Sequence, residues 1–314
     1  MKIFLENVNL NSSSGPNSFA RKMLPYISDH GCVISNLQEA DIALCFIEST
    51  IGKISIPRVQ RLDGIYFNTS QDFNLLNSNI KKTFLDSQGI IFQSNFNKEL
   101  ITKWYGKPDN FTVIHNGADL KSINNTSTMK NTKYDNIWCC AASWRPHKRL
   151  KENIDYFLQH KGNNDLLIIA GDVPEDQKKI DKSIAYFGNL NQTQLYSLYK
   201  ASKYFLHLAW LDHCPNVVVD ARACGCHIIC SSAGGTKEIA GPDATIIEES
   251  TTTTVEIQEY EEGITAAAAA DNNINNNQKE KKFNNDVSVL HNSEIINNPM
   301  YKNLAATIQK KSVL

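Results

Sequence analysis

The sequence predicts an α/β protein with two Rossmann-like domains whose parallel sheets face each other across a cleft. Short apolar stretches of strand length alternate with amphipathic, helix-like stretches through residues 1–250, which is the pattern of parallel α/β sheets. The polar, Asn-, Thr- and Ser-rich stretch 121–134 divides this alternation into two series of six strands. With 314 residues and 41% hydrophobic content, the chain is long enough to bury two cores of roughly 130 to 150 residues each.

The first series fills residues 1–125, which we predict to form one domain. Its strands are short runs rich in Ile, Leu, Val and Phe, expected at 2–6, 32–35, 41–46, 58–62, 89–93 and 112–115. Its helices are expected at 17–30, 70–87 and 96–105, with Gly31 and Gly106 ending the first and the third. Residues 126–134 then form the linker.

The second series fills residues 135–250, the second predicted domain. Its strands are expected at 137–143, 166–170, 185–187, 204–209, 227–230 and 245–247, and its helices at 150–159, 192–201, 216–224 and 236–239. The pattern is lost after this point, because 251–297 is rich in Thr, Ala and Asn and has no core periodicity. A last helix is expected within 298–314.

The composition favours a cytoplasmic enzyme that acts on small molecules. Lys and Arg number 32 against 33 Asp and Glu, so nothing indicates nucleic acid as a partner. No apolar run approaches the length of about 20 residues that spans a membrane, and the start of the chain reads as a strand rather than a signal peptide. Most of the eight cysteines lie in apolar stretches as small hydrophobic residues, which suggests a reducing compartment. The closely spaced Cys224, Cys226 and Cys230 match no common zinc pattern.

The stretch 203–241 carries the strongest functional signal. It reads as strand, polar loop, helix, strand and Gly-Gly loop, and both loops are expected outside the carboxyl ends of parallel strands, where such sheets bind ligands. The free N–H groups of a helix that opens near Asn216 make an anion site. Asp212 and Asp220 flank this helix start, and their carboxylates suit the hydroxyls of a nucleotide.

A basic turn follows the first strand of the second domain. Residues 141–149 read AASWRPHKR and include Arg145 and Lys148. Cationic side chains at a strand-to-helix turn suit a diphosphate, because their charges add to the helix-end N–H groups. The alternative interpretation is a basic turn that is only solvated. The position of the turn at the carboxyl edge of the sheet favours the diphosphate site.

These motifs resemble the family-4 (group 1) retaining glycosyltransferases of the GT-B fold. That family has two acids eight positions apart, then Ala-x-Ala-x-Gly and Gly-Gly-x-x-Glu. This chain has Asp212 and Asp220, Ala-x-Ala-x-Gly at 221–225, and Gly-Gly-x-x-Glu at 234–238. Both acids are Asp where the family has Glu. The resemblance extends over about residues 1–241 and is most specific after His115.

The resemblance implies roles for residues around the donor. Asp212 lies near the transferred sugar and Asp220 accepts hydrogen bonds from the ribose. Lys148 contacts the diphosphate; Ser143 stands where the family has Arg, so Arg145 is expected to supply that charge. Further donor contacts are expected from the backbone at Asn216, Val217 and Gly188, from Gly15 in the loop after the first strand, and from Glu238.

Some of these assignments have a second interpretation. Glu238 is equally explained as an acid that interacts favourably with a helix N-terminus, and Gly15 as part of an ordinary helix start. Asp63, in an Arg-Leu-Asp-Gly turn, either faces the cleft and contacts the acceptor or sugar, or has no such role.

The resemblance implies a retaining hexosyltransferase that moves a sugar from a nucleotide-diphospho-sugar to a glycan or lipid-linked acceptor. Neither a metal nor another cofactor is expected, because the cations and the helix end stabilise the departing diphosphate. Three alternatives remain: a glycan phosphorylase, a nucleotide-sugar epimerase, and an inactive nucleotide-sugar binder descended from a transferase. Peripheral membrane contact is left open.

Overall fold

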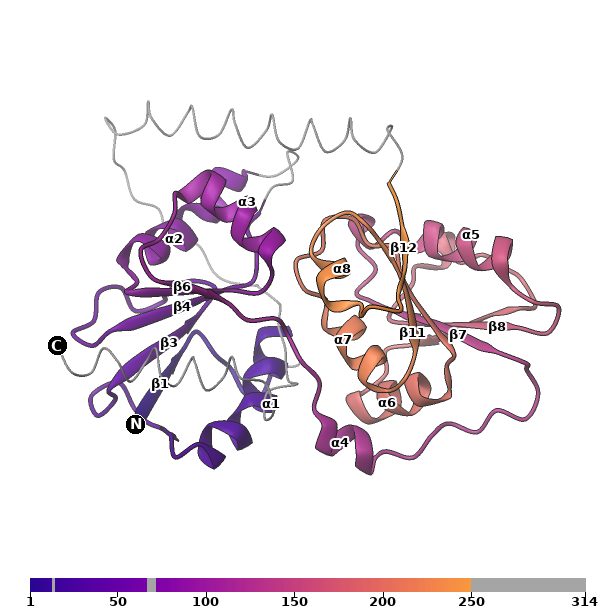
Figure 1. Cartoon of the computed structure of the whole chain (residues 1–314), viewed down its shortest axis with the longest axis horizontal. Coiled ribbons are helices and arrows are strands. Elements are labelled where there is room, and N and C mark those ends of the chain that lie inside the picture. Colours follow the sequence, from indigo (N-terminus) through magenta and orange to yellow (C-terminus); the bar gives the residue numbers. More distant parts are fainter. Residues whose placement is uncertain (13–14, 67–71, 250–314) are drawn as a thin grey trace. The chain divides into compact units, whose positions relative to one another are not determined.

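The computed structural model describes residues 1–12, 15–66 and 72–249, which form two compact units, Met1–His115 and Asn116–Glu248. Each unit is a six-stranded parallel sheet covered by helices on both faces (Figure 1). The predicted α/β class with two Rossmann-like sheets is therefore confirmed. The expectations for 251–297 and 298–314 lie outside the described residues.

The first unit is built on a sheet with strand order β2-β1-β3-β4-β5-β6. The strands are β1 (Lys2–Glu6), β2 (Val33–Ile34), β3 (Ile42–Phe46), β4 (Arg58–Leu62), β5 (Gly89–Phe92) and β6 (Phe111–Val113). The helices are α1 (Gly15–Asp29), α2 (Phe73–Asp86) and α3 (Asn95–Tyr105). α2 and α3 cover one face of the sheet and α1 covers the other (Figure 1).

The core of the first unit reflects these two layers. A larger cluster, which includes Leu62, Phe84 and Phe92, packs α2 and α3 onto the sheet, and a smaller one joins Phe19 of α1 to Phe46. Central strands bury both faces, so they read as continuous apolar runs rather than alternating ones. The helices begin where the sequence provides a cap: Ser94 accepts a hydrogen bond from the backbone N–H of Asn97 at the start of α3.

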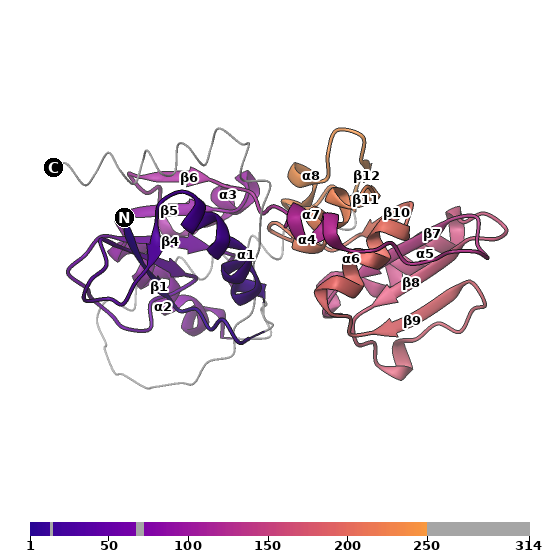
Figure 2. The ribbon, with the colours of Figure 1, turned by 90° about the horizontal axis from the view of Figure 1, so that it is seen from below.

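The second unit has strand order β12-β11-β10-β7-β8-β9. Its strands are β7 (Ile137–Ala141), β8 (Leu166–Ala170), β9 (Ile184–Gly188), β10 (Tyr204–His207), β11 (His227–Ser231) and β12 (Thr245–Ile247). Its helices are α4 (Leu120–Asn125), α5 (Leu150–His160), α6 (Gln192–Ala201), α7 (Asn216–Ala223) and α8 (Thr236–Ile239), with short 3-10 turns at Pro146–Lys148 and Glu175–Gln177. Strands β10, β7, β8 and β9 follow one another across the sheet in Figure 2.

Two features of the second unit differ from the sequence prediction. Strands β7 and β10 end at Ala141 and His207, two residues before the predicted ends, because the chain turns there into the loops at the sheet edge. Helix α4 begins at Leu120, partly within the stretch predicted to be only polar loop. The side chain of Asp119 caps the helix by accepting a hydrogen bond from Ser122 N. This cap is the one local signal for the helix in the sequence, because six residues are too few to show a helical periodicity.

Candidate functional site

The sheet of the second unit has one point where the strands are added in opposite directions, and the candidate site lies there. From β7 the chain adds β8 and β9 on one side, then returns to place β10 directly beside β7 on the other. In open parallel sheets the loops after two such strands diverge, and ligands bind in the crevice between them. The loop after β7 carries Lys148, and the loop after β10 carries Asp212.

The side chains of Lys148 and Asp212 meet as an ion pair. Lys148 Nζ donates to Asp212 Oδ2, and His207 Nε2 lies 2.9 Å from the same oxygen. Burial alone would raise the pKa of Asp212, but Lys148 and His207 outweigh it and hold this pKa well below its ordinary value of 3.8. Asp212 is therefore an ionised carboxylate that only accepts hydrogen bonds, so His207 Nε2 carries a proton and donates it.

His207 is a buried, neutral partner of Asp212. Burial lowers its pKa below the ordinary value of 6.5, and Lys148 lowers it further, against the opposing effect of Asp212. The residue is 4% exposed. Sequence analysis did not select it, because a histidine at the end of an apolar run reads as part of the strand core.

The loop after β7 is fixed by Asn153, a buried residue of α5. Its Nδ2 donates to the carbonyls of Lys148 at 3.2 Å and Arg149 at 2.7 Å, and its Oδ1 accepts from Leu208 N at 3.2 Å. Asn153 therefore ties the loop that carries Lys148 to the end of β10. Arg149 adopts a left-handed conformation with φ 51°, which turns the chain into α5.

The loop after β10 is fixed from the other side by the Gly-Gly segment. Gly235 N donates to Asp212 O at 2.7 Å. Gly234 has φ +91°, and a Cβ there would lie 2.7 Å from Asp212 O, closer than any side chain tolerates. Glycine is therefore required at 234 by both its backbone conformation and its contact with the loop of Asp212.

Helix α7 begins beside this loop without a side-chain cap, since Pro215 occupies the cap position. The first N–H groups of the helix, at Asn216 and Val217, are the groups that an anion would use. Asn116 holds the helix start in place: its Nδ2 donates to Cys214 O at 2.6 Å and to Asn216 Oδ1 at 3.3 Å. Sequence analysis did not identify Asn116, because these contacts join residues about a hundred positions apart in the chain.

Asp220 lies further along α7 and is buried at 4% exposure. Gln192 Nε2, at the start of α6, donates to its Oδ2 at 3.0 Å. A buried acid in mid-helix is costly unless it is hydrogen-bonded, so Gln192 helps Asp220 to keep its place. Sequence analysis did not identify Gln192.

The remaining predicted donor residues of this unit occupy several places. Ser143 and Arg145 are exposed in the loop after β7, and the backbone N–H of Arg145 donates to Ser143 O at 2.7 Å. Gly188 ends β9 and its carbonyl accepts from Gly171 N at 2.8 Å, two strands away from Lys148. Glu238 is half-buried in the short helix α8 after the Gly-Gly segment.

Two predicted site residues belong to the first unit. Gly15 is the first residue of α1. Asp63 directly follows β4 and is buried, with its Oδ1 accepting from Arg61 Nη1 at 2.8 Å and Gln93 Nε2 at 2.5 Å. Its Oδ2 has no hydrogen-bond partner within the described residues. Burial raises the pKa of Asp63 well above its ordinary value, although Arg61 and Gln93 oppose this.

Metal-binding and membrane-spanning features were sought in the same residues. Residues 1–12, 15–66 and 72–249 contain no group of three or more His, Cys, Asp or Glu side chains arranged to hold a metal ion. Over the same ranges, no helix combines the length and the apolar character that crossing a bilayer requires.

The chain matches one family by sequence. The sequence model of the family described as "Glycosyl transferases group 1" matches residues 125–285, about half of the chain and most of the second unit. No curated protein matches the sequence significantly.

The fold matches solved structures more extensively. Anabaena Alr3699/HepE in complex with UDP-glucose has a TM-score of 0.58 at 15% identity, over 86% of this chain and 94% of that one. A glycosyltransferase from Rickettsia africae has a TM-score of 0.56 at 15% identity, over 87% of this chain and 93% of that one. WaaG, a glycosyltransferase involved in lipopolysaccharide biosynthesis, has a TM-score of 0.55 at 12% identity, over 88% of this chain and 96% of that one. At such low identity the likeness shows the fold alone, which is GT-B.

Proposed function

The chain belongs to the group 1 glycosyltransferases, and we propose from this premise that it is a retaining, metal-independent hexosyltransferase. Its donor is a nucleotide-diphospho-sugar and its acceptor a glycan or a lipid-linked sugar. The observation that carries the proposal is the contact of Lys148 and His207 with one carboxylate oxygen of Asp212, at the point of the sheet where α/β proteins bind ligands.

The cations and the helix end provide the chemistry at the diphosphate. Negative charge grows on the departing diphosphate as the glycosidic bond breaks, and groups already aimed at that charge stabilise the transition state. Lys148 and the exposed Arg145 supply positive charge, and Asn216 and Val217 supply N–H donors. These groups together take the part that a divalent metal plays in other transferases.

The two acids act on the hydroxyl groups of the donor. Asp212 is ionised, and the ion pair with Lys148 leaves its Oδ1 able to accept a hydrogen bond from the transferred sugar. Asp220, held by Gln192, accepts from the ribose. HepE, whose structure contains UDP-glucose, makes UDP-sugars the first donors to test.

The second candidate is a nucleotide-sugar binder that does not catalyse transfer. It is favoured by Ser143, which stands where the family has Arg, and by the engagement of Lys148 with Asp212. Such a protein would bind the nucleotide but would release no sugar.

Single-turnover reactions with a panel of UDP-, GDP- and ADP-sugars, each run with EDTA and without it, separate these candidates. We expect nucleotide release from one donor, lost in Lys148→Ala and in Asp212→Ala. Lys151→Ala is the matched control, because the Lys151 side chain is 84% exposed and pairs with Asp155 one helical turn away. Tight nucleotide binding without release from any donor, with acceptor extracts added, would favour the binder, and loss of activity with EDTA would refute metal independence.

A further inference from the structure

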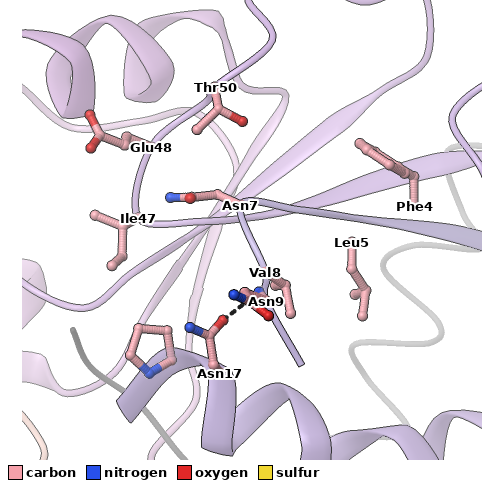
Figure 3. Close-up of a pocket in the computed structure, with 10 residues that line it drawn as sticks. Phe4, Leu5, Asn7, Val8, Asn9, Asn17, Ile47, Glu48 and Thr50 are labelled. Carbon is pink, nitrogen blue, oxygen red and sulfur yellow. Dashed lines mark hydrogen bonds between the residues drawn. The ribbon is translucent and has the colours of Figure 1, made fainter. Parts of the chain in front are cut away.

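Amide side chains at the sheet edges have two different uses in this protein. In the first unit, a pocket beside the loops after β1 and β3 is lined by residues that include Asn7, Asn9 and Asn17 (Figure 3). Asn7 Nδ2 donates to Phe46 O at 2.9 Å, and Asn17 Oδ1 accepts from Asn9 N at 2.7 Å. These amides therefore hold the backbone of their own loops. In the second unit, Gln192 bonds instead to a residue of the candidate site.

Gln192 is the first residue of α6, which begins at the same edge of the sheet as the loops of the candidate site. The helix follows β9, and the loops after parallel strands leave the sheet at one edge. Asn191 and Gln194 form a capping box: Asn191 Oδ1 accepts from Gln194 N at 3.0 Å, and Gln194 Oε1 accepts from Asn191 N at 2.9 Å. The Gln192 side chain is directed to the neighbouring helix α7 instead.

The Gln192 amide has a fixed orientation. Its Nε2 donates to Asp220 Oδ2 at 3.0 Å. Because a carboxylate only accepts hydrogen bonds, the amide nitrogen must face Asp220, and the carbonyl oxygen Oε1 is turned away from it. Asp220 is 4% exposed, whereas Gln192 is an exposed residue. Gln192 is therefore the member of this pair that presents an acceptor to a ligand.

Asp220 connects this amide to the start of α7. Asn216 and Asp220 are four residues apart in the helix, so their side chains share one face and lie about 6 Å apart along its axis. Asp220, with Gln192 beside it, thus lies one helical turn from the N–H groups proposed for the diphosphate. This spacing suits the ribose of the same nucleotide.

The charge beside Gln192 favours a ligand that donates hydrogen bonds. Tyr196, one turn further along α6, is 1% exposed, and burial, Asp220 and Asp119 all raise the pKa of its hydroxyl. Two carboxylates therefore act on this point of the helix, where they attract a hydroxyl hydrogen and repel a phosphate. Ribose has two neighbouring hydroxyls, so it can supply one donor to each of two acceptors.

We propose that Gln192 Oε1 accepts a hydrogen bond from one ribose hydroxyl of the donor nucleotide while Asp220 accepts from the other. The proposal rests on the proposed function, which places the ribose at Asp220. It makes Gln192 a specificity-determining residue that selects ribonucleotides over deoxyribonucleotides. Gln192 also supplies reach, because Asp220 is one methylene shorter than the Glu of the family.

Isothermal titration calorimetry with nucleoside diphosphates tests this contact without any transfer of sugar. UDP, GDP and ADP are titrated into the wild type, and the tightest of them is then compared with its 2′-deoxy and 3′-deoxy forms. We expect the hydroxyl bound by Gln192 to contribute about fivefold in affinity, the effect of one hydrogen bond between uncharged groups. Gln192→Ala should lose one of the two discriminations, keep the other, and bind the ribonucleotide about fivefold more weakly.

Two further variants complete the test. Gln159→Ala, which changes an exposed glutamine of α5, is the matched control and should discriminate as the wild type does. Gln192→Met keeps the length of the side chain without the amide, so it should behave as Gln192→Ala even where alanine reduces stability.

The outcomes separate this contact from the proposed function. Wild-type discrimination in both Gln192 variants would overturn the contact. Loss of both discriminations together would also overturn it, because Gln192 would then act only by bracing Asp220. If no nucleotide binds to the wild type, the proposed function fails as well. Nucleotide binding with the expected discrimination but no sugar transfer would refute the transferase and support the contact.

Discussion

Replacing His207 with phenylalanine removes one of the two hydrogen bonds that hold the carboxylate of Asp212. The histidine ring is buried and stacks on Phe205 with ring centroids 6.4 Å apart. A phenyl ring has similar size and shape, so we expect the packing to survive. The variant therefore tests the hydrogen bond to Asp212 rather than the integrity of β10.

The expected magnitude follows from the contact that is lost. A hydrogen bond to a charged group contributes about 1.5–3 kcal/mol. Asp212 keeps Lys148 and its side chain is 15% exposed, so we take the lower part of this range, about 1.5–2 kcal/mol. If that energy acts in the transition state, kcat falls about ten- to thirtyfold.

The pH dependence has a defined sign. Burial favours the protonated form of Asp212, and His207 and Lys148 oppose it. Without His207 the pKa of Asp212 rises, so the acid limb of the kcat profile moves to higher pH. Activity near neutral pH then reflects lost positioning rather than protonation.

The assay measures kcat and donor KM for wild type, His207→Phe, His207→Gln and His227→Phe across the acid limb. His207→Gln keeps an N–H donor and should recover much of the rate. His227, whose Nε2 contacts Thr245 Oγ1 at 2.8 Å and which pairs with the first residue of β10, is the control far from Asp212 along the strand. Wild-type activity and an unmoved acid limb in His207→Phe would refute the reasoning. Equal losses in the Phe and Gln variants, with equally reduced thermal stability, would show a packing role instead.

Three further outcomes concern stability. Gly234→Ala should lower the free energy of unfolding in urea by about 2–4 kcal/mol, because the new Cβ would collide with the backbone of Asp212. Gly225→Ala is the control: Gly225 also has positive φ, but no atom lies within 4 Å of the added Cβ, so this variant should lose only about 1 kcal/mol. Arg58→Leu should cost about 3–5 kcal/mol, because it leaves the buried carboxylate of Glu6 without its bidentate partner, and additional replacement of Glu6 by leucine should restore most of the loss. Burial lowers the pKa of the half-buried His147 and His213 from 6.5 to about 4, so their stabilising contribution is complete above pH 6.5 and decreases as the pH falls toward 4, by up to about 3 kcal/mol each. Thermal unfolding measured against pH should show this loss of stability, and replacing both histidines with Gln should remove most of it.

The fold was largely predictable because parallel strands leave a strong trace in sequence. Strands buried on both faces must be apolar throughout, so runs such as LLIIA at 166–170 could be located from composition alone. Helix α4 was missed because a six-residue helix is too short to show periodicity. The order of the strands in each sheet was not assigned from sequence, because neighbouring strands are far apart in the chain.

The candidate site was predictable only for residues that belong to a spaced motif. Lys148 and Asp212 were selected from two separate loops, and the sheet brings them into contact. His207, Asn153 and Gln192 were not selected, because each looks ordinary in its own segment: a strand end, a helix interior and a helix start. Their importance comes from hydrogen bonds between segments, which periodicity and spacing do not encode. A polar residue that interrupts an apolar strand next to its carboxyl end is the signal that could have identified His207.

Four residues other than glycine have positive φ in the described part of the chain, and all four lie in loops that follow strands at which strand addition reverses. Where strand addition reverses, the two outgoing loops leave their strands in opposite directions. Left-handed conformations at Asn7, Ile47, Arg149 and Leu211 are found in those loops, each at a cost of about 1–2 kcal/mol for a residue with a side chain. Hydrogen bonds from Asn7 and Asn153 to neighbouring backbone carbonyls offset part of this cost. In the second unit the diverging loops carry Lys148 and Asp212, so the backbone geometry at the reversal point brings together the residues of the candidate site.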